Sequence, residues 1–357
     1  MIIMLHSVWQ ASQILWSLHT QESSSCKEIT KNKYCRSYDI DVQGLPIQVD
    51  HYDPSTQYAG TVVVIHGMSP KGKQDHRVSE LCFALSKVGY RVMAPDIESI
   101  KQLIICPSQI DTIADFLYKI ATDEKLTPSG KIGVLAPSFS GAMCLAAASL
   151  PSIKDRVTAV CAIGAFTEVE SVMAYLLRNG AADPYGRFIV LKKIVPLVCS
   201  ESGLFQGALD AAIQDNLNEI DFDELTNAYN LYLSSLTESN RQKIRRLFYD
   251  VLYREELFAS SKLVLSEELK ALDIVHRIDD LSAKVFLLHG FADSVIPCQQ
   301  SERLYQELKA LNKSAELVIT PFLSHGDTQI RLSQLPDMAR IVQGFASYFR
   351  SISHAGV

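Results

Sequence analysis

The chain has 357 residues, of which 47% are hydrophobic and 21% are charged, and its formal net charge is -6. This composition predicts a soluble globular protein with either one large α/β domain and an insertion or two ordinary domains. The negative charge gives no electrostatic reason to expect nucleic acid or an anionic membrane as a partner, so a small molecule is the better expectation.

Eight cysteines are scattered along the chain without a Cys-x-x-Cys pair, and several lie within apolar runs. Cysteines in such positions behave as small hydrophobic residues. We therefore expect buried, reduced thiols, a cytoplasmic protein, and neither a metal site nor a cofactor.

We expect residues 1–35 to form a separate N-terminal arm. Apolar side chains recur there at helical spacing, namely Met1, Leu5, Val8, Trp9, Leu15 and Trp16. This spacing predicts an amphipathic helix. Lys and Arg are absent from residues 1–26, although export signals and membrane-surface helices usually carry them. We therefore expect the arm to pack on the protein, with membrane contact as the less favoured alternative.

From residue 36 to residue 164 the sequence alternates between strand and helix patterns. Residues 38–42 and 46–52 alternate polar and apolar side chains around Gly44, which predicts a hairpin. The β-branched run 61–65 predicts a strand covered on both faces, as in a parallel sheet. Further strands are expected at 90–94, from 132 and at 156–163, with helices at about 77–88 and 108–122.

The alternation stops between Ala165 and Ala283, a stretch rich in Leu, Ala, Glu, Tyr and Asn at helical spacing. Strand patterns return at 284–290 and 315–319, with helices expected at about 300–311 and 335–351. These patterns predict one α/β core, made of residues 36–164 and 284–357. A helical insertion of residues 165–283, called the cap below, interrupts the core after its sixth strand.

The run from Lys131 to Ala148 predicts a strand, a sharp turn and a helix. Ser138 stands at the apex of the turn, where its hydroxyl would project from the sheet. Ala136 and Ser140, two residues before and after it, are small enough for strand and helix to cross closely. The helix adds free N–H groups and the positive end of its dipole, which favour negative charge on a bound carbonyl oxygen.

This turn resembles the nucleophile elbow of the α/β-hydrolase superfamily, with residues 136–140, Ala-Pro-Ser-Phe-Ser, standing where that superfamily usually shows Gly-x-Ser-x-Gly. Residues 290–297 resemble its acid loop, and residues 322–327 resemble the loop that carries its histidine. The resemblance implies an α/β-hydrolase fold and a triad of Ser138, Asp293 and His325. Each of the three follows a predicted strand, so all three are expected at one edge of the sheet.

Two roles in this triad have alternatives. Ser140 is a second candidate nucleophile, but that register would extend the strand through Pro137, which cannot donate to a strand ladder. Glu168 and Glu170 are alternative acids, although both are expected at the start of a helix, where acidic residues complement the dipole.

An oxyanion hole needs two donors that converge on one point. The residue after the nucleophile, Phe139, would provide one backbone N–H, and the resemblance assigns the other to Met68. His66 and His289 each end a predicted strand, and we expect both to have structural roles. We expect residues 69–77 to form a solvated loop in which Asp75 caps the next helix. Contact of Lys71, Lys73 or Arg77 with an acidic substrate is the less favoured alternative.

The resemblance implies a serine hydrolase without a cofactor that cleaves a carboxylic ester, thioester or amide of a small-molecule acyl substrate through an acyl-enzyme on Ser138. The cap would form the roof of its pocket. Two alternatives stay open at this point. One is a binding protein that keeps the fold without catalysis, because both elbow glycines are replaced, and the other is an acyltransferase that uses the same triad.

Overall fold

The computed structural model describes residues 2–20, 35–218, 220, 226–321, 323 and 335–353. It divides the chain into two compact units. One, the core unit, consists of Met1–Glu168 and Leu272–Val357, and the other, the helical unit, is Val169–Ala271. Residues 165–168 and 272–283, which the sequence pattern groups with the cap, therefore belong to the core unit.

The core unit is built on an eight-stranded sheet with the order β1-β2-β4-β3-β5-β6-β7-β8. All pairs from β4 to β8 are parallel, whereas β1 and β2 run antiparallel to their neighbours. The strands are β1 (Cys35–Val42), β2 (Leu45–Tyr52), β3 (Gly60–Val64), β4 (Tyr90–Pro95), β5 (Ile132–Pro137), β6 (Val157–Ile163), β7 (Lys284–Gly290) and β8 (Ala315–Thr320). The predicted mostly parallel sheet is confirmed.

The predicted hairpin is also confirmed, because β1 and β2 pair along their full length. Gln43 and Gly44 connect them with φ angles of 54° and 83°, the left-handed conformation that a two-residue hairpin turn requires. The Asp41 carboxylate accepts a hydrogen bond from the Gly44 N–H at 3.1 Å and closes the turn.

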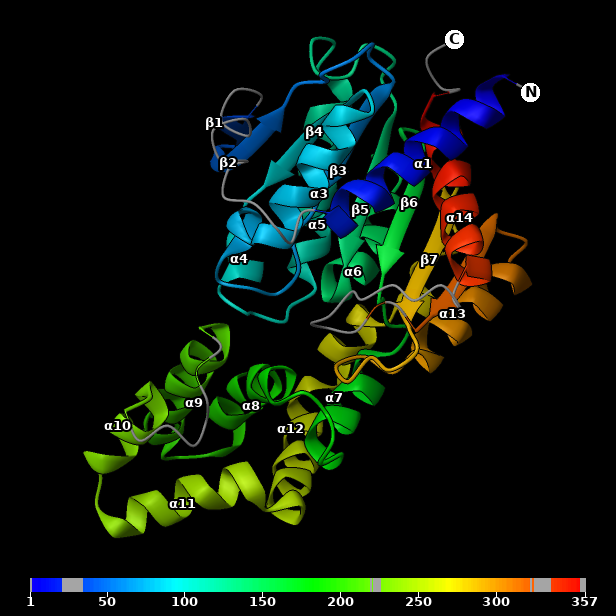
Figure 1. Ribbon diagram of the computed structural model, residues 1–357. Coiled ribbons are helices and arrows are strands. Elements are labelled where there is room, and N and C mark those ends of the chain that lie inside the picture. The colour runs from blue at the N-terminus through cyan, green and yellow to red at the C-terminus, as the bar shows by residue number, and fades with distance from the viewer. Residues whose placement is uncertain are drawn as a thin grey trace. The chain divides into compact units, whose positions relative to one another are not determined.

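Helices flank the sheet (Figure 1). The core-unit helices are α1 (Ile2–Thr20), α3 (His76–Lys87), α4 (Glu98–Lys101), α5 (Ser108–Thr122), α6 (Ser138–Ala148), α13 (Gln299–Ala310) and α14 (Leu335–Ser353). One continuous hydrophobic cluster joins side chains of α1, α3 and α14 to one face of the sheet, while α6 packs on β5 and β6. The sequence pattern did not indicate the short helix α4.

The arm forms the predicted helix, and Figure 1 shows it lying beside α3 and α14. Its buried face differs in part from the predicted one. Val8 and Leu15 pack against the hydrophobic cluster as expected, but Trp9 is 48% exposed whereas Gln10, Ala11 and Ile14 are buried. Gln10 can be buried because its amide donates to the Val88 carbonyl oxygen at 2.8 Å and accepts from the Tyr90 hydroxyl at 3.2 Å. A periodicity of apolar residues cannot anticipate such a polar contact.

The helical unit follows β6 in the chain. Its helices are α7 (Val169–Arg178), α8 (Pro184–Val198), α9 (Ser202–Leu217), α10 (Ala228–Ser234), α11 (Glu238–Tyr249) and α12 (Val251–Leu272). The predicted helical character of this stretch is confirmed, whereas its role as a cap stays a prediction. Buried Arg254 stabilises the unit by donating to the carbonyl oxygens of Leu177 and Phe248 at 2.9 and 2.6 Å. Within the described residues, every helix is too short or too polar to cross a bilayer.

Candidate active site at the carboxyl edge of the sheet

Ser138 lies at the junction of β5 and α6 and is half-buried. Its φ angle is +54°, a left-handed conformation that few residues other than glycine adopt. A serine held at such a strained turn presents its hydroxyl at the edge of the sheet. The crossing behind it is tight, because a Cβ atom added to Gly141 would lie 2.9 Å from the Ala136 carbonyl oxygen. Sequence reasoning singled out the small residues at 136 and 140 and missed this glycine.

Ser140 has a different environment from Ser138. It is fully buried, and its hydroxyl donates a 2.6 Å hydrogen bond to the carbonyl oxygen of His66, in the loop after β3. The second candidate nucleophile therefore already has a hydrogen-bond partner in the protein.

The predicted structural role of His66 is confirmed by its hydrogen bonds. Its Nδ1–H donates to the Gly67 carbonyl oxygen at 2.8 Å, and its Nε2 accepts from the Ile97 N–H at 3.1 Å. Burial lowers the pKa of His66, because a charged imidazole would lose its hydration there. Both ring nitrogens are thus used to fix the loop after β3.

The two predicted oxyanion donors come from neighbouring strands. Phe139 lies in the first turn of α6, where backbone N–H groups lack intrahelical acceptors. Met68 lies in the loop after β3 and is half-buried. Val64 and Leu135 are partners in the parallel ladder of β3 and β5, so the two loops leave the sheet side by side at the same edge.

The carboxylate of Asp293 lies in the loop after β7, and its side chain is 7% exposed. Its Oδ1 accepts from the backbone N–H groups of Val295 and Ile296 at 2.8 and 2.9 Å. Behind it, the fully buried His289 donates from Nε2 to the Ile296 carbonyl oxygen at 2.8 Å and bonds the Ser301 hydroxyl through Nδ1 at 2.7 Å. The structural role predicted for His289 is confirmed.

The sheet brings Ser138 and Asp293 to one edge. Pro137 pairs with Ile163, and Ile163 pairs with Leu288, so β5 and β7 are separated by β6 alone. Two inter-strand spacings amount to about 10 Å. A Cβ atom added to Gly164, after β6, would lie 3.4 Å from Asp293 Oδ2. His325, the predicted base, lies outside the described residues.

Both alternative acids take part in ion pairs. Glu168 Oε2 lies 2.5 Å from Arg303 Nη1 in the core unit. Glu170 is paired with Lys262, and both belong to the helical unit. Both carboxylates therefore have a basic partner in an ion pair at the surface.

The loop after β3 differs from the solvated segment that the sequence predicts. Lys73 is only 3% exposed and pairs with Asp50 of β2, while its backbone N–H donates to Asp96 Oδ1 at 2.9 Å. One lysine of this loop, Lys73, therefore belongs to a buried ion pair with β2 and is not solvated. The predicted helix-capping role of Asp75 is confirmed, because its carboxylate accepts a hydrogen bond from the Arg77 N–H, in the first turn of α3, at 3.1 Å.

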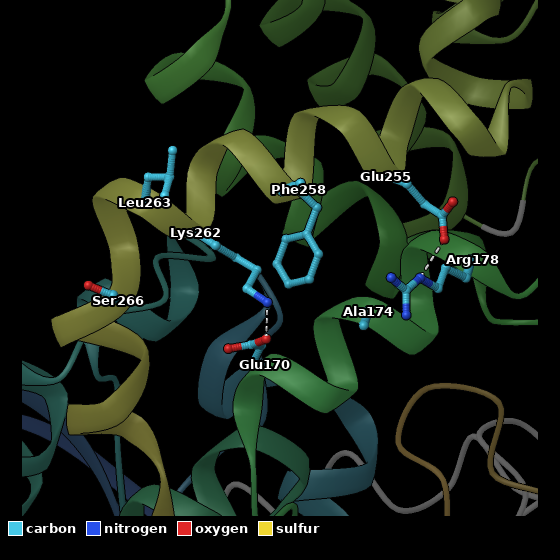
Figure 2. Close-up of a pocket in the computed structure, with 9 residues that line it drawn as sticks. Glu170, Ala174, Arg178, Glu255, Phe258, Lys262, Leu263 and Ser266 are labelled. Atoms are coloured by element: carbon cyan, nitrogen blue, oxygen red, sulfur yellow. Dashed lines mark ion pairs between the residues drawn. The ribbon is translucent and has the colours of Figure 1, made fainter.

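A separate hollow of about 460 Å³ lies between α7 and α12 of the helical unit (Figure 2). An ion pair between Arg178 and Glu255 at 2.5 Å borders it, as does the pair of Glu170 with Lys262. Figure 2 shows the ring of Phe258 between these two pairs. Of the predicted site residues and alternatives that the structure describes, Glu170 alone lines this hollow.

Residues 56–326 match the family described as serine aminopeptidase, S33. The chain belongs to this serine aminopeptidase family. The resemblance to the α/β-hydrolase superfamily is thereby confirmed, and the matched range contains Ser138, Asp293 and His325.

Three individual proteins are also similar to this chain, either over a short segment or at low sequence identity. An isoprenylcysteine alpha-carbonyl methylesterase of Arabidopsis thaliana is 32% identical over 104 residues, which cover 29% of this chain and 23% of that protein. An acylaminoacyl peptidase of Pyrococcus horikoshii has a TM-score of 0.50 at 16% identity, covering 89% of this chain and 42% of the other. A puromycin hydrolase has a TM-score of 0.51 at 12% identity, covering 89% and 39%. The chain thus spans less than half the length of these proteins, and the two structures support its fold.

Proposed function

We propose that this member of the serine aminopeptidase family is a serine hydrolase that cleaves a carboxylic ester, thioester or amide through an acyl-enzyme on Ser138. The observation that carries the proposal is the positive φ of Ser138 at the junction of β5 and α6. Holding a non-glycine residue in this conformation costs energy, and such strain is concentrated at functional sites. Ser140 does not have this positive φ, and its hydroxyl already donates to the His66 carbonyl oxygen.

In the proposed reaction His325 accepts the Ser138 proton as the hydroxyl attacks the acyl carbonyl, and later returns it to the leaving group. Asp293 orients His325 and stabilises its positive charge. Two features of Asp293 suit this role. Its Oδ1 is fixed by two backbone N–H groups, and its Oδ2 faces the end of β6, the strand between β5 and β7. Water then hydrolyses the acyl-enzyme.

The backbone N–H groups of Met68 and Phe139 are the proposed oxyanion hole. Negative charge develops on the acyl oxygen in the tetrahedral intermediate, and preorganised donors lower its energy because they need no reorientation. The adjacent positions of β3 and β5 support this assignment. The mechanism requires no cofactor.

The names of the similar proteins include a methylesterase, a peptidase and a puromycin hydrolase. These three names support an acyl group as the shared feature of the substrates, combined with different leaving groups. The helical unit is the proposed cap, and its apolar residues would select the acyl or leaving group.

Labelling with a fluorophosphonate probe tests the nucleophile. We expect the wild-type protein and Ser140→Ala to be labelled and Ser138→Ala to be unlabelled. An unlabelled wild type would indicate a binding protein, and loss of labelling in Ser140→Ala alone would transfer the role to Ser140.

A substrate panel tests the substrate class. Turnover of p-nitrophenyl esters, acyl thioesters and aminoacyl arylamides is compared, with Ser138→Ala as the background. Ester products formed in the presence of added alcohol would indicate acyl transfer instead of hydrolysis.

A further inference from the structure

The hydrogen bond from Ser140 to His66 joins the two segments that carry the proposed oxyanion donors. Ser140 directly follows Phe139 in the first turn of α6, and His66 lies two residues before Met68. The 2.6 Å bond runs from the Ser140 hydroxyl to the His66 carbonyl oxygen, and both side chains are fully buried. A side-chain contact thus connects the start of the helix to the loop after β3.

His66 makes three hydrogen bonds, two of them in addition to the bond from Ser140. The imidazole donates to the Gly67 carbonyl oxygen and accepts from the Ile97 N–H, and the carbonyl oxygen accepts from Ser140. The segment that leads into Met68 is therefore tied both to the loop after β4 and to α6. At the other end, Ser140 is held by the helix itself. Movement of the Met68 loop away from Phe139 would break a buried hydrogen bond.

An oxyanion hole depends on the distance between its donors, because each N–H must lie about 2.7–3.1 Å from the developing oxyanion. Glycine at position 140, which the α/β-hydrolase elbow usually has, could not make this contact. We propose that Ser140 is a positioning residue that sets the spacing of the Met68 and Phe139 N–H groups through His66. This inference rests on the proposed serine hydrolase function.

The simpler explanation is that Ser140 only satisfies a buried carbonyl oxygen. The same helix offers a matched control for it. Ser149, at the carboxyl end of α6, is 4% exposed and donates to the Leu145 carbonyl oxygen at 2.9 Å. Ser149→Ala also removes a buried hydrogen bond from a serine hydroxyl to a carbonyl oxygen, but this bond stays within one turn of α6 and lies far along the helix from the proposed oxyanion hole. A purely structural role predicts similar behaviour of the two alanine variants.

The experiment measures kcat and KM for p-nitrophenyl butyrate, together with the melting temperature, for wild type, Ser140→Ala, Ser140→Gly and Ser149→Ala. We expect Ser140→Ala and Ser140→Gly to lower kcat about 10- to 100-fold, less than the loss of a whole oxyanion donor, while KM changes by less than about 3-fold. Ser149→Ala should keep the wild-type kcat. Inhibition by a butyryl trifluoromethyl ketone, which forms a tetrahedral adduct, should weaken in parallel with kcat.

The proposal is overturned if the folded Ser140 variants keep the kcat and the inhibition of Ser149→Ala. If Ser140→Ala and Ser140→Gly do not fold, Ser140→Cys, with a weaker donor of similar size, decides instead: an unchanged kcat overturns the proposal, and a reduced kcat at unchanged KM supports it. Failure of the proposed function gives a separate result, because the fluorophosphonate would then leave the wild type unlabelled. That result removes the basis of the Ser140 role as well.

Discussion

The Nε2 atom of His289 lies 3.5 Å from Oδ2 of Asp293, and the same nitrogen donates to the Ile296 carbonyl oxygen in the Asp293 loop. The imidazole, near the end of β7, thus meets the loop that carries the proposed acid at two points, Asp293 and Ile296. The Ser301 hydroxyl, which bonds Nδ1 of His289, also lies 3.0 Å from the Ala165 carbonyl oxygen after β6, so its proton has two neighbouring acceptors. The position of the carboxylate therefore depends on a buried hydrogen-bond network behind it.

His289→Ala should lower the free energy of unfolding by about 2–4 kcal/mol, because it leaves a cavity and an unsatisfied carbonyl oxygen. Chemical denaturation measures this loss, and the exposed His276→Ala is the control with an expected change below about 0.5 kcal/mol. The variant should also lower kcat. That effect should vanish in an Asp293→Asn background, and an equal loss in both backgrounds would argue against an action through Asp293.

Asp293→Asn should reduce kcat by about 10³- to 10⁴-fold, since a neutral amide cannot stabilise an imidazolium. The fold should be retained, because the Asn carbonyl oxygen can still accept from Val295 and Ile296. Ester turnover is compared with that of Glu168→Gln, which breaks only the ion pair with Arg303, and of Glu170→Gln. A large loss in either glutamate variant, with little loss in Asp293→Asn, would reassign the acid.

Acid should destabilise the protein through His66. Burial lowers the pKa of His66 in the folded state, whereas the unfolded value is about 6.5. Its contribution to stability is therefore complete above about pH 6.5 and is lost as the pH falls toward the folded-state pKa, with a slope of at most about 1.4 kcal/mol per pH unit.

Unfolding free energies at pH 7.5 and 5.5 test this linkage. His66→Asn should show a smaller difference than wild type, and His76→Asn, whose side chain is 73% exposed, should match wild type. Some dependence should persist in His66→Asn, because burial also lowers the pKa of His51. An identical pH dependence in His66→Asn and wild type would contradict the assignment.

Lys73→Met should destabilise the protein by about 3–5 kcal/mol, because it leaves the Asp50 carboxylate without its buried cation. The exposed neighbour Lys71→Met is the control, with an expected loss below about 1 kcal/mol. Adding Asp50→Leu to Lys73→Met should recover part of the loss. Calorimetry or denaturant unfolding measures all three, and equal effects of the two lysine variants would show that the pair is not effectively buried.

The sequence by itself determined the regular part of the architecture. Continuous β-branched runs such as 61–65 indicate strands covered on both faces, and amphipathic repeats such as 108–122 indicate helices that flank them, because burial of apolar surface imposes these periods locally. The small residues around Ser138 indicated a sharp strand-to-helix turn for the same reason. Chain order and sheet topology then placed Ser138 and Asp293 at one edge.

Only the tertiary structure decided the partners of polar groups. Lys73 appears as one charge in a polar run, yet it is buried against Asp50, and Gln10 faces the core because Val88 and Tyr90 satisfy its amide. Ser138 and Ser140 look alike in sequence, but one adopts a positive φ and the other bonds His66 across 74 positions of the chain. Hydrogen bonds between distant residues have no local period, so they become visible when the fold brings donor and acceptor together.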